Sequence, residues 1–399
     1  MATKLFRYVL SFFVCFTVLT MTLSSYTSPD SQVVHAYHTL SIKPLGPVII
    51  QEPSLEIATV LPLATNDVWI AGSYSPTDSL TLPLYEHFDG TKWTVISNPA
   101  LGDGGNITGL SAQSAHDIWA VGTYTSNPNN PIDVPLIEHW NGSSWSMINQ
   151  NYSSTFVTGG LTSVVALAAN NVWMVGTQRM SIDDPSTQTF IEHWDGSQIH
   201  AVASPNSIHT TSNYLKAITA RSANDLWSVG ISNTGNTLTE HWDGSQWTIV
   251  ASPNISFNQG IPNFNLLTSV SSASKSDVWA IGLFNATATS FKGALAEHWN
   301  GTQWSIISLQ SLPGNSQELS AVVSLGINDS WALGTSTTNN KAQPLLTHWD
   351  GTIWKTAPLP SSLSSLQYLQ RLASSSTTLV SISKNANETR QLVLLQKTY

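Results

Sequence analysis

The sequence predicts an all-β fold, a single β-propeller, because one repeat fills most of its 399 residues. Each copy has an Asp or Asn and a Trp at the start of an apolar run that ends in Gly. A variable stretch follows, then a segment close to Glu-His-Trp-Asp-Gly and usually a second Trp. The first Trp recurs every 50 to 54 residues, at Trp69, Trp119, Trp173, Trp227, Trp279 and Trp331. A repeat of this length, rich in short strands, is typical of β-propellers.

Each copy predicts one blade of four strands. In the second copy we expect strands at 107–113, 117–122, 136–140 and 145–148. Asn141-Gly142 predicts a tight hairpin turn in which both residues tolerate positive φ. The strand from 117 is apolar on both faces, as expected for a sheet that is covered on both sides. The Trp side chains would fill the gaps between blades, and each indole N–H needs a partner there.

A seventh blade is expected at the C-terminus, although the Trp motif is missing there. Segments 366–373, 377–382 and 391–397 read as three strands. The N-terminal segment 38–43 resembles a fourth strand and would complete this blade, leaving no open sheet edge. The prediction is therefore seven four-stranded blades, and six blades with an irregular end is the alternative.

The N-terminal residues 1–36 have the pattern of a secretory signal peptide. Lys4 and Arg7 precede an uncharged stretch from 8 to 23, and Ser- and Thr-rich sequence follows. Cleavage is expected between about 25 and 36, which leaves a propeller domain over 37–399. The apolar stretch is short for a bilayer span of about 20 residues, so a retained N-terminal anchor is the alternative. A secreted, extracellular protein is expected, or a membrane-anchored one if the segment is kept.

The charge balance restricts the partners. The formal net charge is −9, and only 10% of the residues are charged. Such a surface does not favour nucleic acid, because few cations are available to displace counterions from phosphates. Membrane contact is expected only through a retained N-terminal segment. We expect a monomer without a cofactor, whose partner is an extracellular glycan or a protein.

Residues 67–354 resemble secreted bacterial propellers grouped loosely with Kelch, galactose-oxidase-like and Asp-box (BNR) repeats. The hairpin segment Asp243 to Trp247 is similar in position to an Asp-box, with one residue fewer between Asp and Trp. Copper chemistry of the galactose-oxidase type requires a Cys–Tyr crosslink. The single cysteine, Cys15, lies in the predicted signal peptide, so the sequence excludes that activity for the mature chain.

The repeated Glu-His pair is predicted to be structural. Neighbouring residues of a strand point to opposite faces, so one pair cannot converge on one ligand. The Asp that opens the second strand should instead meet the His at the end of the third, because these strands run antiparallel. The predicted pairs are Asp67 with His87, Asp117 with His139, Asp225 with His241, and Asp277 with His298.

Ligand binding is expected on the opposite face, where the second-to-third-strand loops and the loops between blades are long and variable. Tyr74, Tyr124 and Phe284 share one offset there, two residues after the strand Gly, and Arg179 lies nearby. The aromatic rings either stack on sugars or cover the packing between blades; both readings are open.

Two classes of function follow. The first is a non-enzymatic propeller that binds a carbohydrate or a protein. The alternative is a glycan-active enzyme, a sialidase-like hydrolase or a lyase, although the four arginines outside the signal peptide do not suggest one cluster. Asp183-Asp184 lacks the further ligand spacing of a calcium loop, so no metal site and no catalytic residue is predicted.

Overall fold

A computed structural model gives the arrangement of the chain. It describes residues 39–47, 54–77, 80–99, 104–125, 132–148, 157–179, 181, 183, 186–206, 212–232, 234–256, 263–286, 292–309, 312–339, 341–359, 366–375, 378–385 and 390–398. All regular elements in these ranges are β-strands, and they belong to one compact unit, Thr39–Tyr399. The predicted signal peptide lies outside the described residues. Within the described ranges, no helix is long and apolar enough to cross a membrane.

Each copy of the repeat forms one four-stranded antiparallel sheet, numbered here as blades 1 to 6 in chain order. Blade 2 contains β6 (Gly105–Ser114), β7 (Asp117–Thr125), β8 (Asp133–Trp140) and β9 (Trp145–Met147). The other five are blade 1, β2 (Glu56–Ala64), β3 (Asp67–Thr77), β4 (Leu80–Phe88) and β5 (Trp93–Val95); blade 3, β10 (Thr158–Ala168), β11 (Asn171–Arg179), β12 (Gln188–Trp194) and β13 (Ile199–Val202); blade 4, β14 (Asn213–Ser222), β15 (Asp225–Ser232), β16 (Thr237–Trp242) and β17 (Trp247–Ile249); blade 5, β18 (Asn263–Ser274), β19 (Asp277–Ala286), β20 (Lys292–Trp299) and β21 (Trp304–Ile306); and blade 6, β22 (Ser316–Gly326), β23 (Asp329–Thr338), β24 (Lys341–Trp349) and β25 (Trp354–Thr356).

A further four-stranded sheet closes the ring. It joins β26 (Leu366–Ser375), β27 (Thr378–Asn385) and β28 (Arg390–Thr398) to the N-terminal strand β1 (Thr39–Pro47). β1 pairs antiparallel with β28, from Thr39 opposite Thr398 to Pro47 opposite Gln391. The expected pairing of the N-terminal segment with 391–397 is therefore present, apart from His38, which lies outside the described residues.

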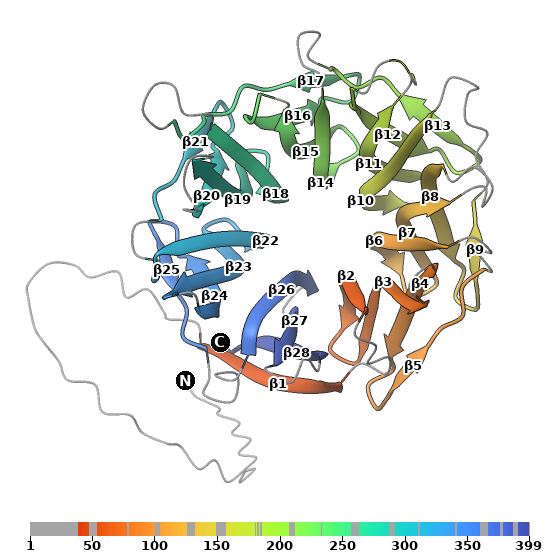
Figure 1. Cartoon of the computed structure of the whole chain (residues 1–399), viewed down its shortest axis with the longest axis horizontal. Coiled ribbons are helices and arrows are strands. Elements are labelled where there is room, and N and C mark those ends of the chain that lie inside the picture. Colours follow the sequence, from red (N-terminus) through yellow and green to blue (C-terminus); the bar gives the residue numbers. More distant parts are fainter. Residues whose placement is uncertain are drawn as a thin grey trace, which may run out of the picture. The chain divides into compact units, whose positions relative to one another are not determined.

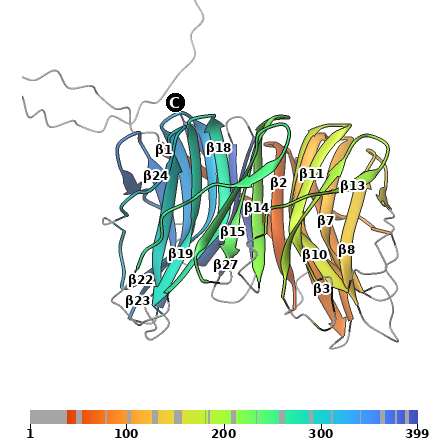
Figure 2. The same ribbon diagram turned by 90° about the horizontal axis from the view of Figure 1, so that it is seen from above.

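The sheets stand around a central axis, with β2, β6, β10, β14, β18, β22 and β26 innermost and β1 on the outer side (Figure 1). Neighbouring innermost strands contact one another around the whole circle, and β26 contacts both β22 and β2. Figure 2 shows that the strands run between two faces of the ring. An all-β single β-propeller, as predicted, is confirmed.

Most of the described hydrophobic core lies between neighbouring blades. Trp69 and Tyr85 of blade 1 pack with Ile118, Leu136 and Trp145 of blade 2 in a single buried cluster. Equivalent clusters join blades 2 and 3, 3 and 4, 4 and 5, and 5 and 6. This explains why the second strands are apolar on both faces, since each sheet is covered on both sides.

The Gly that ends each apolar run accommodates a β-bulge. In blade 2 the pairing of β6 with β7 shifts between Ile107 and Gly109, which leaves Thr108 as an extra residue. The bulged backbone folds over Gly122, where an added Cβ would overlap the carbonyl oxygen of Asn106. The same shift occurs in all six blades that carry the repeat.

The hairpin between the third and fourth strands differs from the prediction in the backbone of Asn141, which was expected to share the positive φ of Gly142. Trp140 pairs with Trp145, so four residues form the loop. Only Gly142 has positive φ in this loop, at 94°. Asn141 instead uses its side-chain oxygen to accept hydrogen bonds from the Ser143 N–H, the Ser143 hydroxyl and the Ser144 N–H, at 2.8 to 3.0 Å. The recurring sequence Asp/Asn-Gly-Ser/Thr is therefore explained by an Asx turn, and not by two consecutive residues with positive φ.

Candidate functional site

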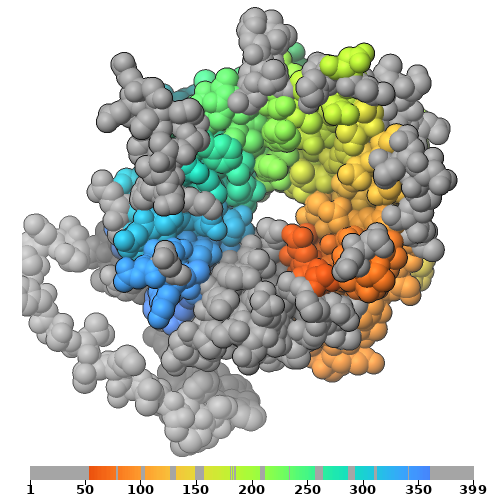
Figure 3. Space-filling model, in the orientation of Figure 1, coloured from red at the N-terminus to blue at the C-terminus, as the bar shows by residue number. Residues whose placement is uncertain are grey.

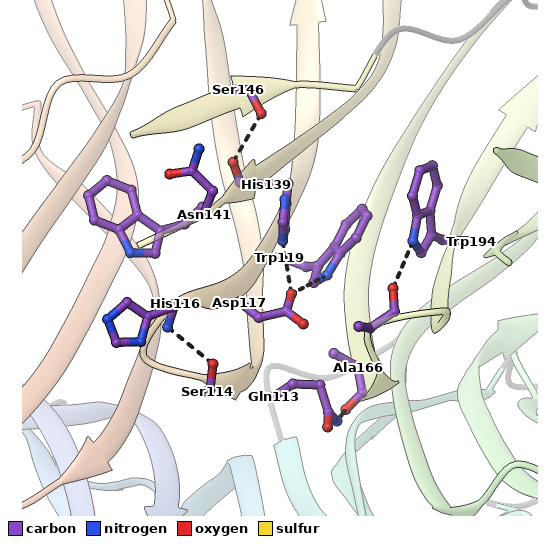
Figure 4. A network of polar contacts seen from close by, with 12 residues as sticks. Gln113, Ser114, His116, Asp117, Trp119, His139, Asn141, Ser146, Ala166 and Trp194 are labelled. Carbon is purple, nitrogen blue, oxygen red and sulfur yellow. Dashed lines mark hydrogen bonds and ion pairs between the residues drawn. The ribbon is translucent and has the colours of Figure 1, made fainter. Parts of the chain in front are cut away.

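The face that carries the short turns is built from a repeated Asp–His–Trp network. In blade 2, Asp117 Oδ1 lies 2.9 Å from His139 Nε2 and 3.0 Å from Trp119 Nε1. Figure 4 shows both rings directed at the same carboxylate. The Trp119 ring also packs on the His139 ring, with centroids 4.6 Å apart. One carboxylate thus satisfies two ring N–H groups at the edge of the core.

The other predicted pairs make the same contact. The Asp Oδ1 to His Nε2 distance is 2.8 Å for Asp67–His87, 2.9 Å for Asp225–His241 and 2.8 Å for Asp277–His298. Asp329 and His348 of blade 6 are also joined, at 2.9 Å. A group of residues that recurs in each blade and is bonded internally holds the blade together, and it leaves no His–Asp pair directed at a common ligand.

Blade 3 has an amide in place of the carboxylate. Asn171 Oδ1 lies 2.8 Å from both His193 Nε2 and Trp173 Nε1. Burial lowers the pKa of His193 below its ordinary value; the nearby Asp195 carboxylate opposes this, and His200 lowers the pKa further. A neutral imidazole is suited to a neutral amide, so this blade keeps the geometry without a charge.

The two Trp positions link neighbouring blades. Trp69 of blade 1 lies 5.0 Å from Trp140 and 5.9 Å from Trp145 of blade 2, measured between ring centroids. The Trp140 N–H donates to the Ala115 carbonyl of its own blade at 3.2 Å. The indole that follows His therefore fixes a turn and covers the preceding blade at the same time.

The Glu of each Glu-His pair lies between blades, on the side of the strand opposite to the His. Glu86, Glu138, Glu192, Glu240 and Glu297 are all buried. Glu138 Oε2 accepts a hydrogen bond of 2.5 Å from the Tyr85 hydroxyl of blade 1. Burial raises the pKa of Glu138 to about 7, and the Tyr85 hydrogen bond lowers it in part. Burial and the neighbouring Glu138 raise the pKa of Tyr85.

Two further glutamates lie near hydroxyls of the preceding blade, and the Ser204 hydroxyl donates to Glu240 Oε2 at 2.9 Å. Burial raises the pKa of Glu240 to about 8, and hydrogen bonds from Ser204 and Thr189 oppose this. Burial likewise raises the pKa of Glu297 to about 8, opposed by Ser252 and Thr237. These glutamates are thus mostly protonated near pH 7 and act as neutral polar groups within the interface. A structural role for the Glu-His pairs was predicted from the sequence, but no partner for the glutamates was.

The aromatic residues predicted to bind ligand lie apart from one another in the packing. Tyr74 packs against the cluster of blade 1, Tyr124 against the cluster of blades 1 and 2, and Phe284 against the cluster of blades 4 and 5. All three are half-buried. Phe284 also covers Gly293 on the neighbouring strand. These positions agree with the packing interpretation, and sugar stacking by the three rings stays a prediction.

Arg179 ends β11 on the face of the long loops. Its backbone carbonyl accepts the Val157 N–H at 2.9 Å, and its side chain is half-buried. The Nε atom is buried without a hydrogen-bond partner among the described residues. The structure does not bring Arg179 together with Tyr74, Tyr124 and Phe284 in a described cavity. The neighbouring loop residue Asp184 lies outside the described residues.

A recess at the central axis, the central channel, collects residues of all six repeats. It has a volume of about 530 Å³ and is lined by the innermost strands of blades 1 to 6. Its lining includes Glu56 and Asn106, from the beginnings of β2 and β6, and therefore lies toward the long loops. Figure 3 shows the hollow at the centre of this view.

Hydroxyl groups line much of this channel and link neighbouring blades. The Thr108 hydroxyl at the β6 bulge lies 3.1 Å from the Val121 carbonyl of its own blade and 2.7 Å from the Leu161 carbonyl of blade 3. The equivalent hydroxyls of Thr162 and Thr268 make the same two contacts, at 2.9 to 3.2 Å. Since each hydroxyl has a single proton, its oxygen lone pairs remain available as acceptors.

Lys216 occupies this bulge position in blade 4. It lines the channel, its side chain is exposed, and its Nζ lies 5.6 Å from the centroid of the Tyr214 ring. Glu56 of blade 1 is the other charged residue of the described lining, and no carboxylate of the described residues forms an ion pair with Lys216. Lys216 was not among the residues predicted from the sequence, although an alignment of the innermost strands shows a Lys there where three copies have Thr.

Three comparisons place the chain among known proteins. No family model and no curated protein matches it. Among solved structures, YCF48 bound to D1 peptide is 14% identical with a TM-score of 0.55, and the match covers 91% of this chain and 98% of that one. YCF48 from Cyanidioschyzon merolae is 14% identical, covers 89% and 98%, and has a TM-score of 0.54. An ulvan lyase, a polysaccharide lyase bound to -[GlcA(1-4)Rha3S]-, is 11% identical, covers 88% and 94%, and has a TM-score of 0.53. At these identities the likeness shows the β-propeller fold alone.

Proposed function

We propose that this protein is a secreted, non-enzymatic propeller that binds a carbohydrate or protein ligand through the face of its long loops. The observation that carries the proposal is the contrast between the two faces. On the turn face, the repeated polar side chains hydrogen-bond to one another or to the local backbone. On the loop face, a channel of about 530 Å³ is lined by side chains that differ between blades. Differences on a rigid scaffold are characteristic of a binding site.

The channel chemistry supports binding more than turnover. Its described lining contains two titratable side chains, Glu56 and Lys216, which belong to blades 1 and 4. A hydrolase or lyase needs an acid and a base placed together at the reacting bond. The similar folds include one bound to a peptide and one bound to a sugar segment, so the architecture accommodates both ligand classes.

A glycan array with the protein from residue 37 onward tests this proposal. We expect selective binding of a group of glycans, with the bound glycan recovered unchanged. Release of new reducing ends or of unsaturated sugars from the bound glycan would instead establish the alternative, a glycan-active enzyme. A protein ligand captured without any glycan binding would move the function to the other partner class.

The location is proposed from the N-terminal sequence. Lys4 and Arg7, the apolar stretch from 8 to 23, and the absence of Cys after Cys15 support export of the chain. Expression of the full chain in a secreting host, followed by N-terminal sequencing of the exported protein, tests it. A mature N-terminus between about 25 and 36 is expected, whereas an intact N-terminus in the membrane fraction would establish an anchor.

We also infer that the sheet of β26, β27, β28 and β1 serves as a seventh blade. Its innermost strand contacts the first strands of blades 1 and 6, so it occupies the place of a blade in the ring. It lacks the Trp motif, and its closing strand comes from the opposite end of the chain.

A further inference from the structure

We propose that the central channel is the binding site for an acidic sugar, with Lys216 as the group that receives the sugar's carboxylate or sulfate. This inference rests on the proposed carbohydrate-binding function and specifies the site and the ligand class. It is carried by the position in blade 4 where, within the described lining, the hydroxyl that links blades is replaced by a lysine.

The first step of the argument is what the Lys replaces. Thr108, Thr162 and Thr268 each donate to a carbonyl of the next blade from this bulge position. The Ser320 hydroxyl donates to the Leu333 carbonyl of its own blade at 3.3 Å, and Ala58 occupies the position in blade 1. A Lys cannot reproduce the short hydroxyl contact, so blade 4 loses a link to blade 5.

The second step is where the ammonium lies. Lys216 is exposed within the channel, and Tyr214 holds its Nζ at a distance that allows a cation–π contact. A surface lysine could move into bulk water, whereas this one stands inside a ring of strands. An anion entering the channel therefore meets a cation that no described carboxylate neutralises, in a setting less solvated than the outer surface.

The third step concerns the remainder of the lining. The Thr108, Thr162 and Thr268 hydroxyls donate their protons to backbone carbonyls, so toward the channel they offer acceptor lone pairs. The Ser163 and Ser269 hydroxyls accept backbone N–H groups and can donate. Glu56 adds an acceptor, and the Asn106 amide can accept or donate. A ligand that supplies several O–H donors and one anionic group matches this set, and an acidic sugar has both. A volume of about 530 Å³ falls within the usual range of about 300–1,000 Å³ for small-ligand sites.

The test is calorimetric titration of the full mature chain with digalacturonate and with digalactose, the neutral disaccharide of the same linkage. Digalacturonate should bind at least about tenfold more tightly, and Lys216→Thr should remove that difference, as expected for loss of one charge-assisted contact. Lys216→Arg should retain binding. Lys275→Thr, which removes an exposed lysine at a turn on the opposite face, is the matched control and should bind as the wild type does.

A second measurement separates binding from folding. Thr is the residue found at the same position in blades 2, 3 and 5, so Lys216→Thr should keep or raise the melting temperature while it loses digalacturonate. If Lys216→Thr unfolds at a lower temperature and binds digalacturonate normally, Lys216 is structural and the inference is wrong.

The remaining outcomes distinguish this inference from the proposed function. If both disaccharides bind equally and Lys216→Thr has no effect, the acidic-sugar inference fails while carbohydrate binding stands. If neither disaccharide binds but trialanine does, and that binding depends on Lys216, the anion site belongs to a peptide and the sugar class is wrong. If the glycan array and both disaccharides are negative, the inference and the carbohydrate function fail together.

Discussion

At the residue scale, the Asp–His–Trp network shows how one acceptor atom can serve two buried donors. The Asp or Asn oxygen accepts from His on the neighbouring strand and, in blades 2, 3 and 6, from the Trp two residues along its own strand. The pattern alone predicted the Asp–His contact, because antiparallel pairing brings these positions together. It did not predict the second donor, since an indole N–H can turn toward either side of a strand.

The amide in blade 3 leads to a first prediction. Asn171→Asp should raise the pKa of His193 toward or above its ordinary value of about 6.5, because a carboxylate at 2.8 Å stabilises the imidazolium. NMR titration of the His193 ring protons measures this change. Asp195→Asn, which removes the other nearby carboxylate, is the control and should lower the pKa of His193 further. An unchanged pKa in Asn171→Asp would show that the oxygen does not face the ring in solution.

The half-buried aromatic residues give a second prediction at this scale. Replacing Tyr74, Tyr124 and Phe284 together by Ala should destabilise the fold by about 1–2 kcal/mol for each ring, since each loses packing against a hydrophobic cluster. Urea denaturation measures the loss. If the triple variant keeps its stability but loses glycan binding, the rings contact ligand and the packing interpretation is wrong.

At the scale of the element, the innermost strand depends on a bulge that the sequence pattern did not reveal. The four strands of each blade followed from apolar runs and turn residues, and those expected in blade 2 overlap β6 to β9. The Gly at the end of the second strand looked like the end of an apolar run. In the structure it is the point over which the bulged first strand folds, and only the pairing of two strands shows why a side chain is excluded.

Gly122→Ala tests this explanation. The added methyl would overlap the Asn106 carbonyl, so the backbone must shift and the free energy of unfolding should fall by about 3 kcal/mol. Gly326→Ala is the matched control: it lies in the innermost strand of blade 6, no atom lies within 4 Å of its added Cβ, and its effect should stay within about 0.5 kcal/mol. Equal losses in the two variants, measured by urea denaturation, would contradict the bulge explanation.

At the scale of the whole molecule, the buried glutamates make stability depend on pH. The pKa of Glu138 is raised to about 7 and those of Glu240 and Glu297 to about 8, all by burial. Between about pH 4.5 and 8 the folded protein therefore keeps protons that the unfolded chain releases. The stability that these protonated glutamates contribute is complete below about pH 4.5 and is lost as the pH rises toward 8.

The expected result is a free energy of unfolding that falls by several kcal/mol between about pH 5 and 8.5. Glu240→Gln combined with Glu297→Gln should flatten this dependence and raise stability at pH 8, because Gln stays neutral. Glu56→Gln, a change at an exposed carboxylate, is the control and should leave the slope unchanged. A slope of the opposite sign would show that these carboxylates are ionised in the fold.

At low pH, the carboxylates of the hairpin turns make the stability of the fold decrease as the pH falls. The hydrogen bond from Thr91 and the turn N–H groups lower the pKa of Asp89 to about 2, and Ser245 with its turn N–H groups does the same for Asp243. Their contribution is present above about pH 4 and is lost as the pH falls through about 2. Stability should therefore be greatest in mildly acidic solution, between the two ranges.

Ring closure provides the last prediction. Deleting residues 39–47 removes β1 and exposes the edge of β28, so we expect a lower melting temperature and association through the open edge. Deleting residues 1–38 keeps every described strand of the ring and should leave the melting temperature unchanged. Thermal unfolding and size-exclusion chromatography measure both effects. Equal behaviour of the two deletions would show that β1 does not close the ring.

The sequence by itself determined the repeating strands, the all-β propeller and the meeting of Asp with His, because these depend on local patterns that recur at a fixed spacing. Only the tertiary structure decided which side chains are shared between blades. Tyr85 reaches Glu138 and Thr108 reaches Leu161 across 53 residues of chain in each case. It also decided that Lys216 faces the channel, since no spacing within one repeat shows which positions of the innermost strand surround the axis. The physical reason is that each sheet buries both faces against other sheets, so a residue's environment is set by the neighbouring blade as much as by its own.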